Sequence, residues 1–432
     1  MKRVVLLLAA LAMFGVEATP YGICAHVTWG EFAGRNRTFA MASAAGIGIV
    51  RCDFNWEDMQ RGAGIDFSKT DAAVADAARY GIQILPIVSY GHRRLCPKPH
   101  QDPEPWGKFV RAVASRYARD CPCFEIWNEQ NNGSFWKGKP AATNYLVVLR
   151  KAFEVIRSVA PNAKVVIGGF AGVPYGYIEE LYKAGGGRYF DVMNVHPYTV
   201  PICPEERLDV MLSKLRGLMA KCGDEKKPIW LTEIGWPTCE RKPTDGSKKL
   251  AWDEEGGVGE QVQAEFTARA MAISFAKGVR KVFPYQFRSD EDRRYSREAG
   301  FGLVHSDFVP KPAWIAYANF ISLCPPGSAP LGERWSVDAK TCLLVWSRPK
   351  DADAWRKGKR RGEWAGMVWK YNGTCHRLLC FASDNVRFYD LFGKELRIDK
   401  VEQGYPIEVS GSPVFFVGDK CLGFADGEVR KY

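Results

Sequence analysis

The sequence predicts a (β/α)8 TIM barrel followed by a small C-terminal antiparallel β-sandwich. Between residues 21 and 324, short β-rich runs alternate with longer helical patterns, and eight such units can be counted. After Pro325-Pro326-Gly327 the chain holds only short strand-like runs separated by turn residues. Alternating strands and helices indicate parallel strands joined by crossover helices, and eight repeats are typical of a closed barrel.

The barrel strands are expected where apolar and β-branched residues cluster between turn signals. In chain order they are residues 21–29, 50–56, 82–90, 123–128, 165–170, 192–198, 229–234 and 279–287. Alanine-rich helical patterns lie between them, for example at 66–81, where Asp66 or Ser68 can cap the helix and Gly81 can end it. Another helix is expected at 141–160, before Pro161, and the last one contains Trp314 and Tyr317.

The sandwich strands are expected at residues 341–346, 364–371, 377–381, 386–389 and 413–417. Short β-rich runs between Gly, Asp and Asn turns favour an antiparallel arrangement. We therefore predict a catalytic barrel over residues 19–325 and an accessory sandwich over 326–432.

The first 18 residues have the three regions of a secretory signal peptide: a basic start, an apolar run over 4–14 and small residues near 16–18. The run is too short to span a bilayer, and no later run is long enough, so we expect no membrane insertion. The expected location is secreted or periplasmic.

The net charge of +11 is compatible with an anionic partner or with a basic, well-solvated surface. The basic run at 356–361 lies in a predicted loop, and no nucleic-acid motif accompanies it, so we expect no nucleic-acid partner. Thirteen cysteines make disulfides plausible in an exported chain, but neither they nor the six histidines show zinc-site spacing. We expect no metal and no cofactor, and the sequence does not indicate an oligomeric state.

Two glutamates end short apolar runs, Glu129 on the fourth predicted strand and Glu233 on the seventh. Reactive groups of β/α barrels collect at the C-terminal ends of the strands, so the two carboxyl groups should converge there. Retaining glycosidases need one carboxyl group as acid and one carboxylate as nucleophile, about 5 to 5.5 Å apart. Beside them, Asn128 can bind a sugar hydroxyl, and Trp127 and Trp236 offer flat faces for a sugar ring.

The segments 124–129 (Phe-Glu-Ile-Trp-Asn-Glu) and 231–236 (Leu-Thr-Glu-Ile-Gly-Trp) resemble the acid/base and nucleophile motifs of glycoside hydrolase clan A. The likeness extends over nearly the whole barrel, including residues 50–56, 81–86, 301–304 and 310–313. Within the clan, the strand motifs are most similar to family 39, with family 5-like enzymes as neighbours.

The resemblance implies roles for residues at the strand ends. Glu129 would be the general acid/base, Glu233 the nucleophile and Asn128 the partner of the substrate's 2-hydroxyl group. Arg51 would lie beneath Glu233 and keep it ionised; a barrel-interior salt bridge with Glu125 or Asp53 is the alternative, and both can hold at once.

Further residues are expected at the same face of the barrel. His196 and Tyr198 end the sixth strand, where they are expected to face the nucleophile or the sugar; a satisfied core histidine is the alternative for His196. His92 follows the third strand with a weaker claim. Where many clan members place a tryptophan on strand eight, Tyr285 or Phe287 takes the position, and Arg288 is aimed at the mouth.

The predicted function is a secreted retaining hydrolase of a β-linked glycan that acts by double displacement. Its partner would be an oligo- or polysaccharide. Arg288 and the loop arginines at 93, 94, 293 and 294 suit an anionic sugar, with solvated loop arginines as the alternative. A transglycosylase with the same glutamate pair and a non-catalytic carbohydrate-binding barrel are the other readings.

Overall fold

The computed structural model describes residues 19–29, 32–244, 249–290, 293–335, 340–349 and 363–425. The predicted signal peptide at 1–18 and the basic run at 356–361 lie outside the described residues. The chain divides into two compact units. The first comprises Met1–Tyr198, Val210–Ile234 and Gly278–Phe287, and the second comprises Thr199–Asp209, Gly235–Lys277 and Arg288–Tyr432.

The first unit contains an eight-stranded parallel sheet in the order β1-β2-β5-β6-β7-β8-β9-β10. The strands are β1 (Gly22–Cys24), β2 (Ile49–Asn55), β5 (Gln83–Ser89), β6 (Cys123–Asn128), β7 (Lys164–Ala171), β8 (Met193–His196), β9 (Ile229–Ile234) and β10 (Val279–Pro284). The sheet closes on itself, because Tyr21 forms a parallel bridge with Val282 and the Phe287 amide donates to the Cys24 carbonyl at 2.8 Å. The predicted barrel is therefore confirmed.

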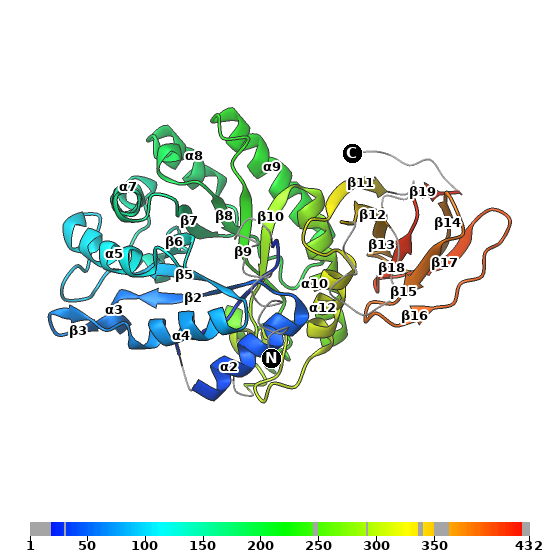
Figure 1. The fold of residues 1–432 in the computed structure, drawn as a ribbon, viewed down its shortest axis with the longest axis horizontal. Coiled ribbons are helices and arrows are strands. Elements are labelled where there is room, and N and C mark those ends of the chain that lie inside the picture. The colour runs from blue at the N-terminus through cyan, green and yellow to red at the C-terminus, as the bar shows by residue number, and fades with distance from the viewer. Residues whose placement is uncertain are drawn as a thin grey trace, which may run out of the picture. The chain divides into compact units, whose positions relative to one another are not determined.

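A helix follows each barrel strand in the sequence, and in Figure 1 the helices α4, α5, α7 and α8 lie outside the strands. The helices are α2 (Phe32–Ala45), α4 (Ser68–Arg79), α5 (Pro103–Tyr117), α7 (Ala142–Val159), α8 (Tyr175–Lys183), α9 (Leu208–Lys221), α10 (Glu260–Ala276) and α12 (Pro312–Leu323). Shorter elements between them include α3 (Trp56–Met59), the hairpin of β3 (Gln60–Arg61) and β4 (Gly64–Ile65), α6 (Gly133–Trp136) and α11 (Arg297–Gly300).

Helix α4 shows how the local sequence sets an element's ends. The Asp66 carboxylate accepts the Ser68 amide at 2.9 Å, and Gly81 takes the expected left-handed conformation with φ 68°. Helix α5 begins at Pro103, whose fixed φ suits the first helical position, after Asp102 has accepted the Glu104 amide at 3.3 Å. The residues that cap α4 and α5 can be recognised in the sequence. Each of the two helices connects two successive parallel strands of the barrel.

Side chains fill the barrel interior, so it is a packed core and not a channel. A buried cluster draws one residue or more from nearly every strand: Cys24, Ile49, Leu85, Cys123, Val166, Val192, Trp230 and Phe283. The ring of Phe283 lies 2.2 Å from where a β-carbon of Gly22 would be, so strand β1 needs a glycine there. This filled interior fixes the strand ends at which the polar groups gather.

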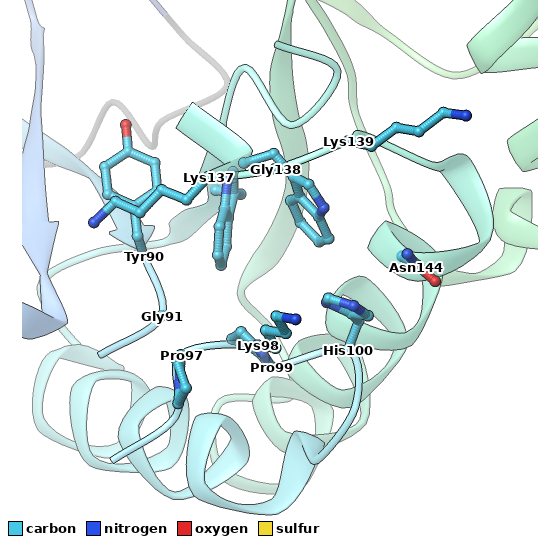
Figure 2. Close-up of a pocket in the computed structure, with 12 residues that line it drawn as sticks. Tyr90, Gly91, Pro97, Lys98, Pro99, His100, Lys137, Gly138, Lys139 and Asn144 are labelled. Atoms are coloured by element: carbon cyan, nitrogen blue, oxygen red, sulfur yellow. The ribbon is translucent and has the colours of Figure 1, made fainter. Parts of the chain in front are cut away.

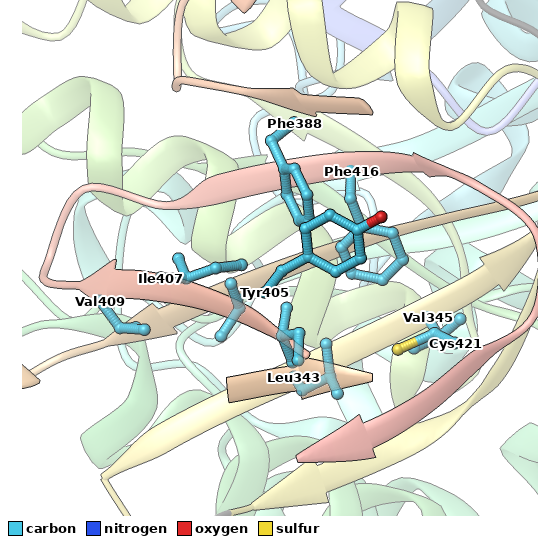
Figure 3. Close-up of a cluster of buried hydrophobic side chains, with 10 residues drawn as sticks. Leu343, Val345, Phe388, Tyr405, Ile407, Val409, Phe416 and Cys421 are labelled. Atoms are coloured by element: carbon cyan, nitrogen blue, oxygen red, sulfur yellow. The ribbon is translucent and has the colours of Figure 1, made fainter. Parts of the chain in front are cut away.

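The second unit contains two antiparallel sheets, ordered β11-β12-β13-β18-β15-β16 and β17-β14-β19. The strands are β11 (Ala329–Trp335), β12 (Thr341–Ser347), β13 (Trp364–Lys370), β14 (Cys375–Phe381), β15 (Val386–Tyr389), β16 (Glu395–Leu396), β17 (Tyr405–Val409), β18 (Val414–Gly418) and β19 (Cys421–Phe424). Figure 3 shows side chains of both sheets meeting in one cluster that includes Leu343, Tyr405 and Phe416. The predicted sandwich is confirmed, and the sequence pattern had missed β11, β16, β17 and β19.

The second unit also takes in helices α10 and α12. Within it, Arg269 of α10 forms a buried ion pair with Glu205 at 2.6 Å and donates to the Gly411 carbonyl at 3.1 Å. The indole N–H of Trp369 on β13 donates to the same Glu205 at 2.8 Å. A buried polar network therefore ties α10 to the sandwich.

Candidate active site

Arg51 on β2 is the centre of a buried polar cluster inside the C-terminal end of the barrel. Its guanidinium is 3% exposed and forms a two-pronged ion pair with Glu125 at 2.7 and 2.8 Å. It also donates to Glu233 Oε1 at 2.6 Å and to the Asn128 side-chain oxygen at 2.8 Å. The two alternatives for Arg51 thus hold together, since one guanidinium serves both an interior salt bridge and the glutamate on β9.

Glu129 and Glu233 converge on His196. The Nδ1 atom of His196 lies 3.1 Å from Glu129 Oε1 and 3.6 Å from Glu233 Oε2. One carboxylate oxygen from each glutamate and one ring nitrogen lie within 4.8 Å of one another. The ends of β6, β8 and β9 therefore bring together three residues that are far apart in the sequence.

The second nitrogen of His196 points into the barrel and is held by a hydroxyl group. His196 Nε2 lies 3.0 Å from the Thr232 hydroxyl, and this hydroxyl donates to Glu125 Oε1 at 3.3 Å. His196 is fully buried, so both ring nitrogens need a partner, and both have one. The imidazole is consequently fixed between Thr232 and the two glutamates.

Tyr198 donates its hydroxyl to Glu233 Oε2 at 2.9 Å, on the side opposite the arginine. Burial, and next the negative charge of Glu233, raises the pKa of Tyr198 well above its usual value. Tyr198 is therefore a protonated donor at any physiological pH. The half-buried ring of Tyr285 packs edge-on against Tyr198, with 6.5 Å between centroids, beside the site as expected for strand eight.

The backbone at the end of β6 is strained. Trp127 and Glu129 both adopt positive φ, at 76° and 49°, which residues with a β-carbon rarely do. The Glu129 amide donates to the Gly169 carbonyl at 2.8 Å, and Asn132 donates to Glu129 Oε2 at 3.3 Å. Such strain persists only where the surroundings impose it, and here it turns the Glu129 side chain toward His196.

The two tryptophans expected as sugar platforms are buried. Trp127 is 3% exposed and packs against the rings of Tyr90 and Trp136, with centroids 5.3 and 5.0 Å away. Trp236 is 1% exposed, belongs to the second unit and donates its indole N–H to the Ile202 carbonyl at 3.0 Å. Neither offers a free flat face to a sugar, because packing in the core occupies it.

His92 shapes the loop after β5. Its Nδ1 atom accepts the backbone N–H groups of Arg94 and Leu95, each at 3.1 Å, and its ring packs on Trp56. These contacts order the loop around His92, and its expected substrate contact stays a prediction. The sequence carries no signal for this, because the loop doubles back without a helical or strand pattern.

Four of the five arginines expected at the mouth, all except Arg94, have other partners among the described residues. Arg288 lies in the second unit with its guanidinium over the Phe308 ring, 4.8 Å from the centroid. Arg93 pairs with Glu57 at 2.7 Å, and Arg294 pairs with Glu240 at 2.8 Å. These ion pairs neutralise charges that would otherwise be available to an anionic sugar.

Several residues of the site were not predicted from the sequence. Thr232, Tyr90 and Asn132 were not singled out, and Glu125 was considered only as a partner of Arg51. Glu125 did carry a signal, since a charged residue inside a fully buried strand needs a buried partner. Tyr90 carried another, because it directly follows a barrel strand, and its hydroxyl is hydrogen-bonded to the side chain of Asn128.

Glu129, His196 and Glu233 are also the group of acidic and histidine side chains in the described residues that is compact enough to ligate a metal. Both oxygens of Glu233 already accept hydrogen bonds, from Arg51 and Tyr198. His196 Nε2 is engaged by Thr232. Arg51, Tyr198 and Thr232 thus already engage three of the polar atoms in this group.

An eight-stranded β/α barrel with a glutamate at the end of its fourth and of its seventh strand has the architecture of a clan A glycoside hydrolase. The family model for cellulase, glycosyl hydrolase family 5, matches residues 11–259. The chain belongs to this family and is a glycoside hydrolase. The predicted resemblance to clan A is thereby confirmed.

Solved structures of the same clan share the fold. A family 39 glycoside hydrolase from the gut symbiont Bacteroides cellulosilyticus WH2 is 22% identical, with a TM-score of 0.74 over 93% of this chain and 81% of that one. A family 39 β-xylosidase from Caulobacter crescentus is 14% identical, with a TM-score of 0.64 over 95% and 97%. A family 30 endoxylanase from Clostridium papyrosolvens C71 is 11% identical, with a TM-score of 0.64 over 94% and 98%.

At these identities the likeness concerns the fold alone. No curated protein matches the chain at a significant level of similarity. Within the described residues, no helix combines the length and the apolar character needed to cross a membrane. None of the thirteen cysteines, all of which lie in described residues, forms a disulfide.

Proposed function

We propose that the protein is an exported retaining hydrolase that cleaves a β-linked glycan by double displacement. The supporting observation is that a carboxylate oxygen of Glu129 and one of Glu233 lie within 4.8 Å of each other, at the C-terminal ends of β6 and β9. Retaining enzymes hold their carboxyl groups about 5 to 5.5 Å apart, and inverting enzymes hold them about 6.5 to 9.5 Å apart to admit a water molecule. The short separation favours retention.

Glu233 is the nucleophile in this proposal. Arg51 and Tyr198 donate one hydrogen bond to each of its oxygens, at 2.6 and 2.9 Å, which orients the carboxylate and stabilises its charge. Glu233 attacks the anomeric carbon as the bond to the leaving oxygen breaks. The product is a glycosyl ester on Glu233, which water hydrolyses in the second step.

Glu129 is the acid/base in this proposal, and the hydrogen-bond chain through Thr232 and His196 favours a protonated Glu129. Glu125 pairs with Arg51, the Thr232 hydroxyl donates to Glu125, and the Thr232 oxygen therefore accepts from His196 Nε2–H. In a neutral His196 the facing Nδ1 is then an acceptor, 3.1 Å from Glu129. A protonated Glu129 completes this chain and can give its proton to the leaving group.

Asn128 is placed to bind the hydroxyl beside the reacting carbon. Arg51 holds its side-chain oxygen at 2.8 Å, which leaves the amide group to act as a donor. The family is described as cellulase, and the structural neighbours include a β-xylosidase and an endoxylanase. A neutral β-linked sugar backbone is therefore the proposed scissile unit, and the first 18 residues support export of the enzyme to reach it.

Two substitutions test the assignment. Glu233→Gln should abolish turnover of an activated aryl β-glycoside, while Glu154→Gln on the exposed surface of α7 should keep it. Glu129→Ala should be rescued by azide, which attacks the glycosyl ester, releases Glu233 and gives a β-glycosyl azide detectable by NMR. Full activity of both Glu233→Gln and Glu129→Ala would refute the assignment, and an α-glycosyl azide would refute retention.

A further inference from the structure

A pocket of about 230 Å³ lies beside the glutamate site, at the same end of the barrel. One wall is the loop after β5, and the other is the segment that follows α6 (Figure 2). Its lining residues are Tyr90, Gly91, Pro97, Lys98, Pro99, His100, Trp127, Trp136, Lys137, Gly138, Lys139 and Asn144. The volume is below the roughly 300 to 1,000 Å³ of drug-sized ligand sites, so it suits a single sugar unit.

The pocket carries positive charge and no carboxylate. Lys98, Lys137 and Lys139 line it, and no acidic side chain does. Among the described residues none of the three lysines has a carboxylate within ion-pair distance, although Lys137 is within electrostatic range of Glu57. A pocket wall with uncompensated positive charge and no carboxylate favours an anionic ligand. In Figure 2, Lys98 points toward the pocket from one wall, whereas Lys139 points away.

Two buried polar atoms in the same pocket lack a hydrogen-bond partner. They are Nε1 of Trp127, in a side chain that is 97% buried, and Nδ1 of His100. Leaving a buried donor or acceptor unpaired costs about 1 to 3 kcal/mol, which a ligand hydroxyl can recover. Burial, and next the charge of Lys98, lowers the pKa of His100. Its imidazole is therefore neutral at pH 7 and can either donate to or accept from a hydroxyl.

Aromatic rings complete the lining. Trp136 lies 5.0 Å from Trp127 and 5.5 Å from His100 between ring centroids, and Tyr90 closes the side toward the glutamates. Apolar ring faces with a few fixed polar groups are typical of small-molecule sites. Tyr90 belongs to both places, because its hydroxyl is hydrogen-bonded to the side chain of Asn128.

We propose that this pocket is a second sugar subsite, which binds a glycan unit carrying a carboxylate or a sulfate group. Lys98 pairs with the anionic group, His100 and the Trp127 N–H bind hydroxyls, and Trp136 contacts the ring. The inference rests on the proposed function, since it makes the substrate a β-linked glycan with acidic units. The proposal does not use the loop arginines at 93, 293 and 294, because each already forms an ion pair with a carboxylate.

Isothermal titration calorimetry of the full-length protein with D-glucuronate, D-glucose 6-sulfate and D-glucose tests whether the pocket prefers an anionic sugar. Both anionic sugars should bind more tightly than glucose, and Lys98→Ala should weaken them by about tenfold or more, as expected for a charged hydrogen bond, without changing glucose. Lys108→Ala removes the same charge from the exposed face of α5 and should change no affinity. Equal affinities for glucuronate and glucose, or equal losses in the two variants, would overturn the proposal.

A second variant and two simple ions test the hydroxyl contacts and the nature of the site. His100→Phe keeps the ring beside Trp136 but removes Nδ1, and it should weaken all three sugars to a similar degree. Unchanged affinities would contradict that contact. Sodium acetate and sodium sulfate should bind more weakly than the matching sugars; equal binding would mean a plain anion site and no sugar subsite. Whichever of glucuronate and glucose 6-sulfate binds more tightly shows whether the subsite prefers a carboxylate or a sulfate group.

Glu233→Gln separates this inference from the proposed function. The variant should lose turnover yet keep its affinity for glucuronate, because Glu233 does not line the pocket. If Glu233→Gln abolishes turnover but Lys98→Ala changes no sugar affinity, the subsite is rejected and the catalytic assignment stands. If Lys98→Ala weakens glucuronate but Glu233→Gln remains active, the subsite stands and the catalytic assignment fails.

Discussion

A β-carbon on Gly169 would lie 1.9 Å from Nε2 of His196. Gly169 is on β7 and His196 ends the neighbouring strand β8. The imidazole therefore occupies space that only glycine leaves open, and this space lets its other nitrogen reach Glu129 at 3.1 Å. A position that looks like an ordinary strand residue in the sequence thus controls the geometry of the proposed catalytic pair.

Gly169→Ala should lower kcat/KM by about 100-fold, the typical cost of misplacing a catalytic group by about 1 Å. The added methyl group has to displace His196, and with it the contact to Glu129. Steady-state kinetics on an aryl β-glycoside measures the loss. Gly176→Ala is the control, because a β-carbon there meets nothing within 4 Å in helix α8. Wild-type kinetics in Gly169→Ala would show that His196 does not position Glu129.

Tyr198→Phe should lower kcat/KM by about 10- to 100-fold, in line with the loss of one hydrogen bond to the charged carboxylate of the proposed nucleophile. Since burial raises the pKa of Tyr198, the hydroxyl stays protonated from pH 5 to 9, and the ratio of wild-type to variant activity should be constant over that range. A pH–rate profile of both proteins measures it. Tyr177→Phe on α8 removes a hydroxyl outside the site and should keep full activity.

The same shift affects stability at high pH. The pKa of Tyr198 in the folded protein lies above its unfolded value of about 10. Its contribution to the free energy of unfolding is therefore complete below pH 10 and is lost as the pH rises through the folded-state pKa. The alkaline fall in unfolding free energy should therefore be smaller in Tyr198→Phe than in the wild type. An identical alkaline fall in the two proteins would contradict the burial of this hydroxyl in the folded state.

Arg51→Met should destabilise the barrel by about 3 to 5 kcal/mol, because it leaves Glu125 buried without its cation. Urea unfolding followed by tryptophan fluorescence measures this free energy. The double variant Arg51→Met/Glu125→Gln removes the uncompensated charge and should recover part of the loss. If the double variant is no more stable than the single one, charge burial is not the cause.

Phe416→Ala should destabilise the sandwich by about 3 to 5 kcal/mol through the cavity left in its core. Phe392→Ala is the surface control, since this ring is 38% exposed, and it should cost much less. We expect the barrel's activity and the sandwich's fluorescence to be lost together, because the second compact unit includes the barrel helices α10 and α12. Activity that outlasts the sandwich would instead support separate folding of residues 326–432.

The sequence predicted the bounds of a strand most accurately where both faces of that strand are buried. The predicted strands 123–128 and 229–234 match β6 and β9 residue for residue, because continuous apolar runs between turn signals have few other interpretations. The first strand was predicted over 21–29, yet only Gly22–Cys24 pairs as a strand. Apolar residues beyond it belong to a loop, and composition alone does not separate the two.

The site was predicted best where a role depends on a strand end. Glu129, Glu233, His196 and Tyr198 meet because the barrel topology forces these ends together. The expectations for His92 and Trp236 depended on loops, whose paths follow from tertiary contacts such as the Arg94 and Leu95 amides on His92. Short periodic patterns do not encode such contacts, so the sequence did not reveal them.

The shared guanidinium of Arg51 has a consequence for how charge moves during turnover. Before the reaction, Arg51, Glu125 and an ionised Glu233, with Glu129 protonated, carry a net charge of −1. In the proposed glycosyl ester, Glu233 is neutral and Glu129 has lost its proton, so the sum is again −1. The negative charge moves from Glu233 to Glu129, both of which lie near Nδ1 of His196, and the net charge of the buried cluster is the same before and after the step.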